Sequence, residues 1–137
     1  MGDPDDFTDF VQWSMSNYPS DYYYVAIHDH GHGIFGLSWD HNDQEGSIDD
    51  YLTPPELRSA LKEITNNGEN KINIFEYQAC LMGLLENAYD IRQYVDYICF
   101  FQPISWSSYN YPEYFKDISQ GDDPLEVAKH IINNYRF

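Results

Sequence analysis

The most constraining feature of the sequence is an apolar segment that runs into a cluster of histidines and glycines. Residues 22–27 read YYYVAI, and residues 28–33 read HDHGHG. A short aromatic and β-branched run bounded by polar residues is typical of a β-strand, and its unbroken apolar character predicts burial on both faces. Ligand-binding and catalytic groups of open α/β sheets gather at the carboxyl ends of strands. The sequence therefore predicts a site at this strand end, with His28, His30 and His32 as candidates.

A second strand is predicted further along the chain. Residues 71–75 read KINIF, and the following EYQAC ends in Cys80, fifty residues after His30 (80 minus 30). We expect this strand to deliver Cys80 to the start of a helix. Apolar residues at helical spacing predict that helix to end near Tyr94, and residues 96–101 predict a third strand; the spaced residues are Leu84, Leu85, Ala88, Ile91 and Val95.

The order of the predicted elements defines the fold class. A helix is expected over residues 3–17, where proline follows a capping aspartate, and a capping box begins another helix at Thr53. Residues 31–46 are predicted to be a loop, and two helices are expected over residues 112–119 and 124–135. Helices that alternate with strands imply an α/β fold, with a mainly parallel sheet and helices on both of its faces. The length, 137 residues, fits one domain.

Composition excludes several classes of partner. The net charge is −16, from 23 acidic and 7 basic residues, and such a field repels phosphate backbones and anionic lipid. Nucleic-acid and membrane roles are therefore not expected, whereas cationic peptides or metal ions are better partners. No apolar run approaches the roughly 20 residues of a membrane span, and the first residues do not resemble a signal peptide. Two cysteines are too few for a disulfide framework.

A histidine and a cysteine on neighbouring strand ends predict nucleophilic catalysis. An imidazole that takes the thiol proton produces the reactive thiolate, and a nearby helix amino terminus would favour it further. The backbone amides of Gly31 and Cys80 are candidate donors to an oxyanion. The tripeptide Gln78-Ala79-Cys80, with His30 fifty residues upstream, also matches a caspase signature, although residues 81–83 differ from its continuation.

Three blocks of the sequence resemble the clostripain family of cysteine peptidases, which are relatives of the caspases. The blocks are residues 29–31, 50–58 and 79–83, and the last is accompanied by matches at Glu86, Ala88, Tyr89 and residues 94–98. The resemblance implies a caspase-like three-layer sandwich and a cysteine endopeptidase that hydrolyses a peptide or protein substrate. It also implies His30 as the catalytic histidine, Cys80 as the nucleophile, and an extracellular or cell-envelope location. Residues 1–137 would then form a single domain lacking the family's first strand and C-terminal part.

Two departures from the family pattern affect substrate preference. Members usually carry an aspartate two residues before the cysteine, which helps to bind a basic side chain at P1, the residue on the amino side of the cleaved bond; this chain has Gln78 there. They also tend to have an acidic segment where this chain has residues 102–106. We expect Gln78, Gln102 and Trp106 to shape the substrate pocket. A neutral amide does not neutralise a desolvated cation, so cleavage after arginine or lysine is not expected.

Other interpretations stay open. A catalytically inactive caspase-like scaffold that binds peptides or a partner is the main alternative, and His32, also followed by glycine, is the alternative base. The three histidines suggest zinc, but glycines interrupt the strand that would align them. Residues 40–46 and 67–76 echo calcium-binding EF-hand loops without the required carboxylates, so a calcium-binding module is a weaker alternative.

The proposed chemistry requires no cofactor, although calcium binding is compatible with it. Cys99 lies within an apolar strand and is expected to be a buried hydrophobic residue. Few basic residues precede Arg58 after Gly31, so we expect an intact single chain.

Overall fold

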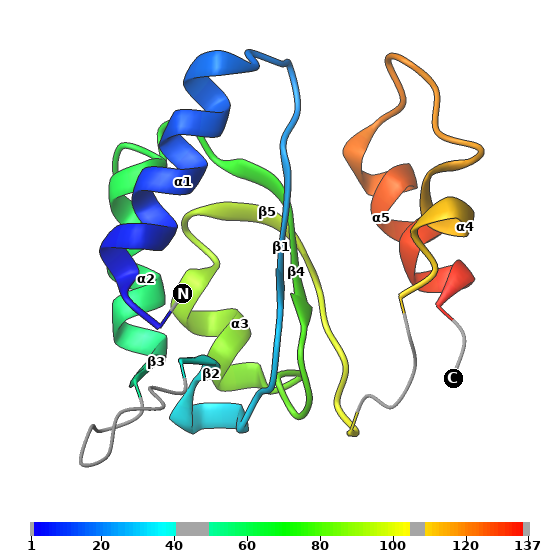
Figure 1. The fold of residues 1–137 in the computed structure, drawn as a ribbon. Helices are drawn as coiled ribbons and strands as arrows, with labels where there is room; N and C mark the ends of the chain where they lie inside the picture. The colour runs from blue at the N-terminus through cyan, green and yellow to red at the C-terminus, as the bar shows by residue number, and fades with distance from the viewer. Residues whose placement is uncertain (1, 41–49, 105–108, 136–137) are drawn as a thin grey trace.

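The computed structural model of the chain describes residues 2–40, 50–104 and 109–135. Its centre is a three-stranded parallel sheet of order β1-β4-β5, and helices form a layer on each face (Figure 1). The predicted α/β fold, with a parallel sheet between two helical layers, is therefore confirmed. The sheet strands are β1 (Tyr24–His28), β4 (Ile72–Gln78) and β5 (Val95–Cys99); α1 (Pro4–Asn17), α2 (Pro54–Ile64) and α3 (Leu85–Ile91) cover one face, and α4 (Tyr111–Phe115) and α5 (Pro124–Asn134) lie on the other.

Three helices begin where the sequence predicted because their capping side chains bond the first turn. The Asp3 and Asp123 carboxylates each accept a hydrogen bond from a backbone N–H two residues later, at 2.8 Å. Thr53 and Glu56 form a reciprocal capping box at the start of α2. These caps satisfy amides that have no partner within the helix, so local sequence is enough to place the helix starts.

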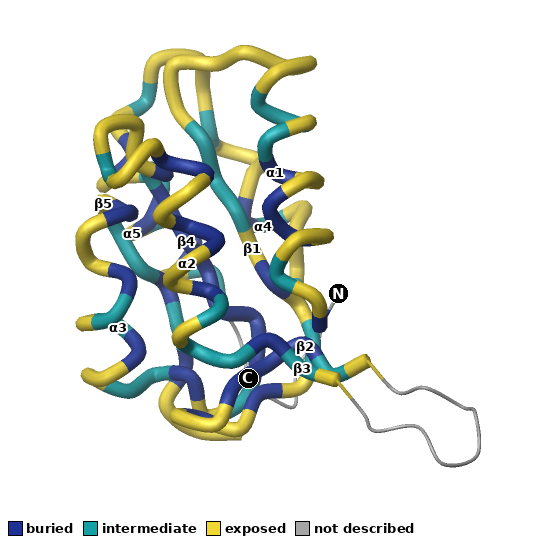
Figure 2. The backbone as a smooth tube through the Cα atoms, turned by 90° about the vertical axis from the view of Figure 1, so that its left-hand side faces the viewer, coloured by how far each residue is buried: buried dark blue, intermediate teal, exposed yellow. Residues whose placement is uncertain are grey.

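The strand β1 differs from the prediction that it is buried on both faces. It is an edge strand, and its burial alternates: Ile27 is buried, whereas Ala26 and His28 are exposed (Figure 2). The helix α5 packs mainly on β5 and β4, so it leaves much of this face of β1 uncovered. The apolar run reflects contacts of one face with the core and of the other with surface aromatic groups.

The boundaries around Cys80 also differ from the prediction. The strand β4 continues to Gln78, and α3 does not begin until Leu85. Between them the chain turns, with Leu81 in the left-handed region at φ 62°. Val95, assigned to the helix by its spacing, begins β5, which ends at Cys99 instead of residue 101. Side-chain periodicity alone does not reveal these turns, because apolar residues continue through them.

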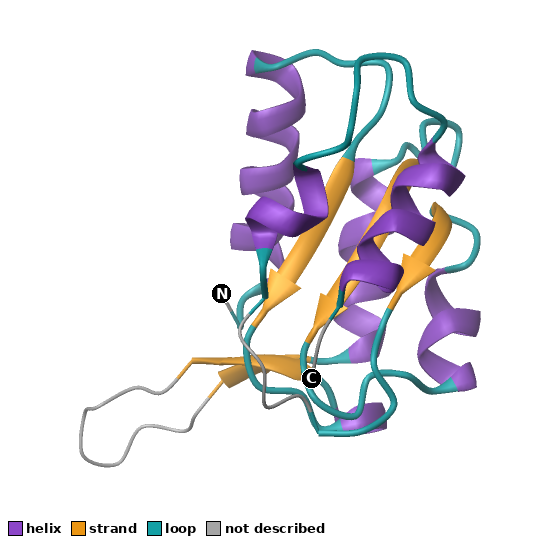
Figure 3. Ribbon diagram, turned by 90° about the vertical axis from the view of Figure 1, so that its right-hand side faces the viewer, coloured by secondary structure: helices purple, strands orange, loops and turns teal. Residues whose placement is uncertain are grey.

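The predicted loop after β1 contains a hairpin that the sequence did not reveal. A short 3₁₀ turn (Gly33–Phe35) leads into β2 (Leu37–Asp40), which pairs antiparallel with β3 (Asp50–Leu52) beyond the carboxyl ends of the main strands (Figure 3). Gly36 permits this pairing, since a Cβ there would lie 2.5 Å from the Leu52 carbonyl oxygen. The segment 41–49, and with it most of the first calcium-like loop, lies outside the described residues.

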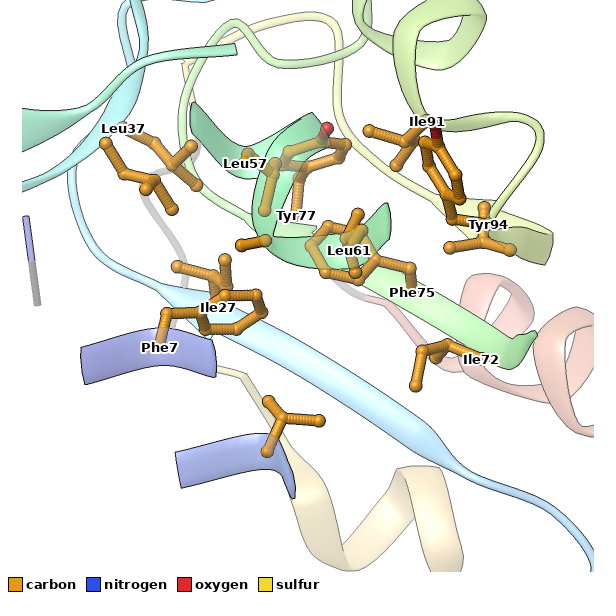
Figure 4. Packing of buried hydrophobic residues seen from close by; sticks show 14 of the residues in the cluster. Phe7, Ile27, Leu37, Leu57, Leu61, Ile72, Phe75, Tyr77, Ile91 and Tyr94 are labelled. Atoms are coloured by element: carbon orange, nitrogen blue, oxygen red, sulfur yellow. The ribbon is translucent and has the colours of Figure 1, made fainter. Parts of the chain in front are cut away.

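The main core lies between the sheet and the layer of α1 to α3. In Figure 4 Phe7 of α1 and Leu57 and Leu61 of α2 face Phe75 and other side chains of the sheet. Each of these four side chains is at most 3% exposed. Burial of one such side chain contributes about 1.5–3 kcal/mol, so this layer holds β1 and β4 rigidly beside each other.

Candidate active site

Parallel pairing of β1 and β4 aligns the two segments that carry the candidate residues. His28 is the register partner of Gln78, and the Asp29 N–H donates to the Gln78 carbonyl at 3.4 Å. His30 and Cys80 each stand two residues beyond that pair. The two residues, fifty positions apart in sequence, therefore leave the sheet at the same edge and side by side.

One cleft joins the candidate base and nucleophile. Its cavity volume is about 240 Å³. His30 is exposed and Cys80 is half-buried, so both are reachable from solvent through this cleft. The cleft is lined by His28, Asp29, His30, Gln78, Ala79, Cys80 and Tyr109.

Gly31 holds the two strand ends in direct contact. A Cβ atom at this position would lie 2.4 Å from the Cys80 carbonyl oxygen and 3.0 Å from Met82 Cγ, so only glycine fits. Gly31 also bridges to Leu37, through the hydrogen bonds His32 N–H to Gly36 O and Ser38 N–H to His30 O. The Gly31 amide takes no part in those two bonds.

The expectation that a helix amino terminus activates Cys80 is wrong. The cysteine follows β4 in a turn, and α3 begins five residues later at Leu85. The effect of a helix dipole falls off within the first turn, so α3 does not supply it. Any activation of the Cys80 thiol must come from a neighbouring base.

Gln78 is part of a buried hydrogen-bond network beneath the cleft. Its side chain is 2% exposed, and its Oε1 accepts from the Tyr111 hydroxyl at 2.6 Å. Its Nε2 donates to Glu76 Oε2 at 3.1 Å and to the Tyr24 hydroxyl oxygen at 3.2 Å. The Tyr24 hydroxyl in turn donates to Glu76. The network connects β1, β4 and α4 under the candidate site.

Glu76 is the site residue that sequence reasoning missed. It is 0% exposed, and its Oε1 has no hydrogen-bond partner within the part of the chain that the structure describes. Burial raises the pKa of this carboxyl above its ordinary value, although hydrogen bonds from Tyr24 and Gln78 act in the opposite direction. The available signal was a lone acid two residues before Gln78, on the same face of a strand.

The second cysteine lies on the same side of the sheet, away from the cleft. Cys99 is 2% exposed, and burial, together with the nearby Glu76, raises the pKa of its thiol to about 12. A thiol with that pKa stays protonated at neutral pH and is inert as a nucleophile. The expectation for Cys99 is confirmed.

The other two histidines occupy different surroundings. His28 lines the cleft, and its ring meets the edge of Tyr109 with centroids 5.0 Å apart. His32 Nδ1 accepts a hydrogen bond from the Trp39 indole at 3.0 Å, and His32 does not line the cleft. The geometry favours His30 over His32 as the base that faces Cys80.

Comparison with known proteins identifies the family. A sequence model of the clostripain family matches residues 1–137. The chain belongs to the clostripain family. Clostripain from Hathewaya histolytica is 28% identical over 138 aligned positions, which cover 88% of this chain and 25% of clostripain.

A solved clostripain-type structure shows the same fold. The secreted C11 cysteine protease from Bacteroides thetaiotaomicron, crystallised with an irreversible peptide inhibitor, superposes with a TM-score of 0.68 at 23% identity. The superposition covers 97% of this chain and 36% of that protease. The chain thus spans 25% to 36% of the length of these two clostripain-family relatives.

The remaining substrate-binding candidates of this clostripain-family chain are less well placed. Gln102 is exposed in the turn after β5, where its backbone packs against Gly83, and it does not line the cleft. Trp106 lies outside the described residues. Across the described ranges, no three histidine, cysteine, aspartate or glutamate side chains are grouped as metal ligands would be. None of the described helices is long and apolar enough to span a bilayer.

Proposed function

We propose that this chain is the catalytic part of a cysteine endopeptidase of the clostripain type. The observation that carries the proposal is the register of β1 and β4, which brings His30 and Cys80 to one solvent-accessible cleft. Membership of the clostripain family supports the same reaction class. A protein or peptide is the substrate, and no metal takes part in the proposed steps.

In the first half-reaction His30 acts as a general base. Its imidazole takes the proton of the Cys80 thiol, and the thiolate sulfur attacks the carbonyl carbon of the scissile peptide bond. The carbonyl oxygen becomes an oxyanion, and the amides of Gly31 and Cys80 are the proposed donors to it. Collapse of this intermediate breaks the C–N bond, His30 returns the proton to the departing amine, and a thioester on Cys80 remains.

In the second half-reaction the same groups hydrolyse the thioester. His30 takes a proton from a water molecule, whose oxygen attacks the thioester carbonyl carbon. The C–S bond breaks, the sulfur recovers its proton from His30, and the carboxylic acid product leaves. Each proton returns to its starting group, so the enzyme is regenerated without an external reactant.

Covalent labelling tests the proposed roles. A peptide probe with a thiol-reactive warhead is expected to label Cys80, as read by mass spectrometry of the intact chain and its fragments. Labelling should be lost in Cys80→Ala and kept in Cys99→Ala, and His30→Ala should slow it by about 10²–10⁴-fold, as for removal of a general base. Wild-type chain that binds the peptide without reacting at Cys80 would support the inactive scaffold instead.

A further inference from the structure

The floor of the cleft is formed by Gln78, and a buried acid lies directly behind it. Residues two apart in a strand share a face, so Gln78 and Glu76 project to the same side of β4. Gln78 is nearer the strand end and lines the cleft, whereas Glu76 is 0% exposed and does not line it. Their side chains touch through the hydrogen bond from Gln78 Nε2 to Glu76 Oε2, 3.1 Å long. The amide of Gln78 therefore separates the cleft from a carboxyl group.

Gln78 is held firmly in this position. The hydroxyl of Tyr111 donates to its Oε1, and its Nε2 is shared between Glu76 and the Tyr24 hydroxyl oxygen. These contacts use both ends of the amide, and a ligand that bound Gln78 would have to break one of them inside a buried network. A charged ligand would gain only a dipole in exchange.

Glu76 retains an unused acceptor. Its Oε2 receives the bonds from Gln78 and Tyr24, while Oε1 is buried and has no partner among the residues described. Removal of the Gln78 side chain would connect this oxygen to the cleft. A cationic group could then pair with it in a site largely shielded from water.

We propose that Gln78 closes the cleft over the acid of Glu76 and that the cleft therefore selects peptides with an uncharged P1 side chain and rejects arginine and lysine. The inference rests on the proposed peptidase function, since P1 is defined by the bond that Cys80 attacks. A desolvated cation would face a neutral amide that is already bonded on both ends. The lining also contains Asp29, but its Oδ1 accepts the His30 backbone N–H at 2.6 Å, beside β1 and not on the floor.

A matched pair of peptide chloromethyl ketones isolates the effect of charge. The two carry arginine or its uncharged isostere citrulline at P1 and are otherwise identical. Wild-type Cys80 is expected to react at least tenfold faster with the citrulline probe. Gln78→Ala should reverse this preference, and so should Gln78→Asp, which places a carboxylate on the floor and serves as a second variant if Gln78→Ala does not fold.

Double variants identify the acid responsible. The arginine preference of Gln78→Ala should disappear in Gln78→Ala/Glu76→Gln and persist in Gln78→Ala/Asp29→Asn. Equal or faster reaction of the wild-type chain with the arginine probe would overturn the inference. Persistence of the arginine preference after Glu76 is neutralised would overturn it as well.

A binding measurement separates this inference from the proposed function. If neither probe reacts with Cys80, the peptidase proposal has failed, and agmatine, a small guanidinium, then tests the floor of the cleft by calorimetry. Gln78→Ala should bind agmatine at least tenfold more tightly than both the wild-type chain and Gln78→Ala/Glu76→Gln. Equal binding by the three chains would reject the buried-acid model.

Discussion

Gly31 shows how a single hydrogen atom controls the distance between two strand ends. A methyl group there would meet the Cys80 carbonyl oxygen at 2.4 Å and the Ala79 Cβ at 2.9 Å, and neither is the flexible end of a long side chain. Gly31→Ala should therefore separate the turns that carry His30 and Cys80. We expect a loss of about 1–3 kcal/mol in the free energy of unfolding and at least tenfold slower labelling of Cys80.

Gly121 provides the control for this change. It also has a left-handed backbone, with φ 91°, but a Cβ there would meet nothing within 4 Å. Gly121→Ala should cost about 1–2 kcal/mol from backbone strain and leave the labelling rate unchanged. Urea denaturation and labelling kinetics of both variants check the comparison; equal labelling rates in the two would contradict the role given to Gly31.

Glu76 predicts a pH dependence of stability with a definite sign. Its pKa is raised in the folded chain above the ordinary value of 4.5, so the folded state binds this proton more tightly than the unfolded state does. The free energy of unfolding should therefore fall as the pH rises from about 4.5 to the folded pKa. The groups near the carboxyl are Tyr24, Gln78 and His28, and the variant Glu76→Gln removes only the titration.

Urea denaturation between pH 4 and pH 8 measures this contribution. Glu76→Gln should equal the wild-type chain in stability near pH 4 and exceed it at pH 7, because the wild-type carboxyl must then ionise in a buried site. Subtraction of the two curves removes the repulsion common to both chains. A wild-type chain that becomes more stable relative to Glu76→Gln as the pH rises would show that the carboxylate is stabilised by its neighbours.

At the scale of elements, the helix caps act independently of the rest of the fold. Thr53 and Glu56 close the amino end of α2, the helix whose Leu57 and Leu61 cover the sheet. Thr53→Ala should lower the free energy of unfolding by about 1 kcal/mol, since an uncapped amide is left at the helix start. Ser59→Ala is the matched control: its exposed hydroxyl bonds only the Pro55 carbonyl within the helix, and a change within about 0.5 kcal/mol is expected.

The sheet elements depend on more distant contacts. The strand β2 contains Ser38 at φ 59° and follows three glycines, a composition that favours a loop. It forms because β3, which follows at residue 50, supplies the pairing partner. Similarly, the apolar spacing that continues from Leu84 to Val95 conceals the end of α3, which is set by the pairing of Val95 with Ile72. Such boundaries require knowledge of the partner strand.

At the scale of the whole molecule, the net charge of −16 predicts the behaviour of the substrate encounter. A negative field attracts cationic peptides over distances comparable to the Debye length, about 10 Å at 0.1 M salt. Labelling of Cys80 by a probe with lysines placed away from P1 should slow as salt increases from 10 mM to 500 mM. A probe with glutamines at those positions should show little change, and identical salt profiles for the two would exclude electrostatic attraction.

Local sequence was sufficient for the features whose causes lie within a few residues. The caps at Asp3, Thr53 and Asp123, the alternation of helices with strands, and the cysteine and histidine motifs of the family all followed from neighbouring residues. Each depends on a hydrogen bond or a side-chain period that short segments contain. The α/β class followed from the order of those elements.

Tertiary structure decided the features that depend on which segments meet. Only the register of His28 with Gln78 brings His30 beside Cys80, and only the packing of α4 and α5 on one face of the sheet buries Glu76 behind an amide bonded to Tyr111. A sequence lists the groups but not their solvent exposure or their partners across the sheet. Pairing and burial are properties of the assembled layers, and they determine which of those groups face the cleft.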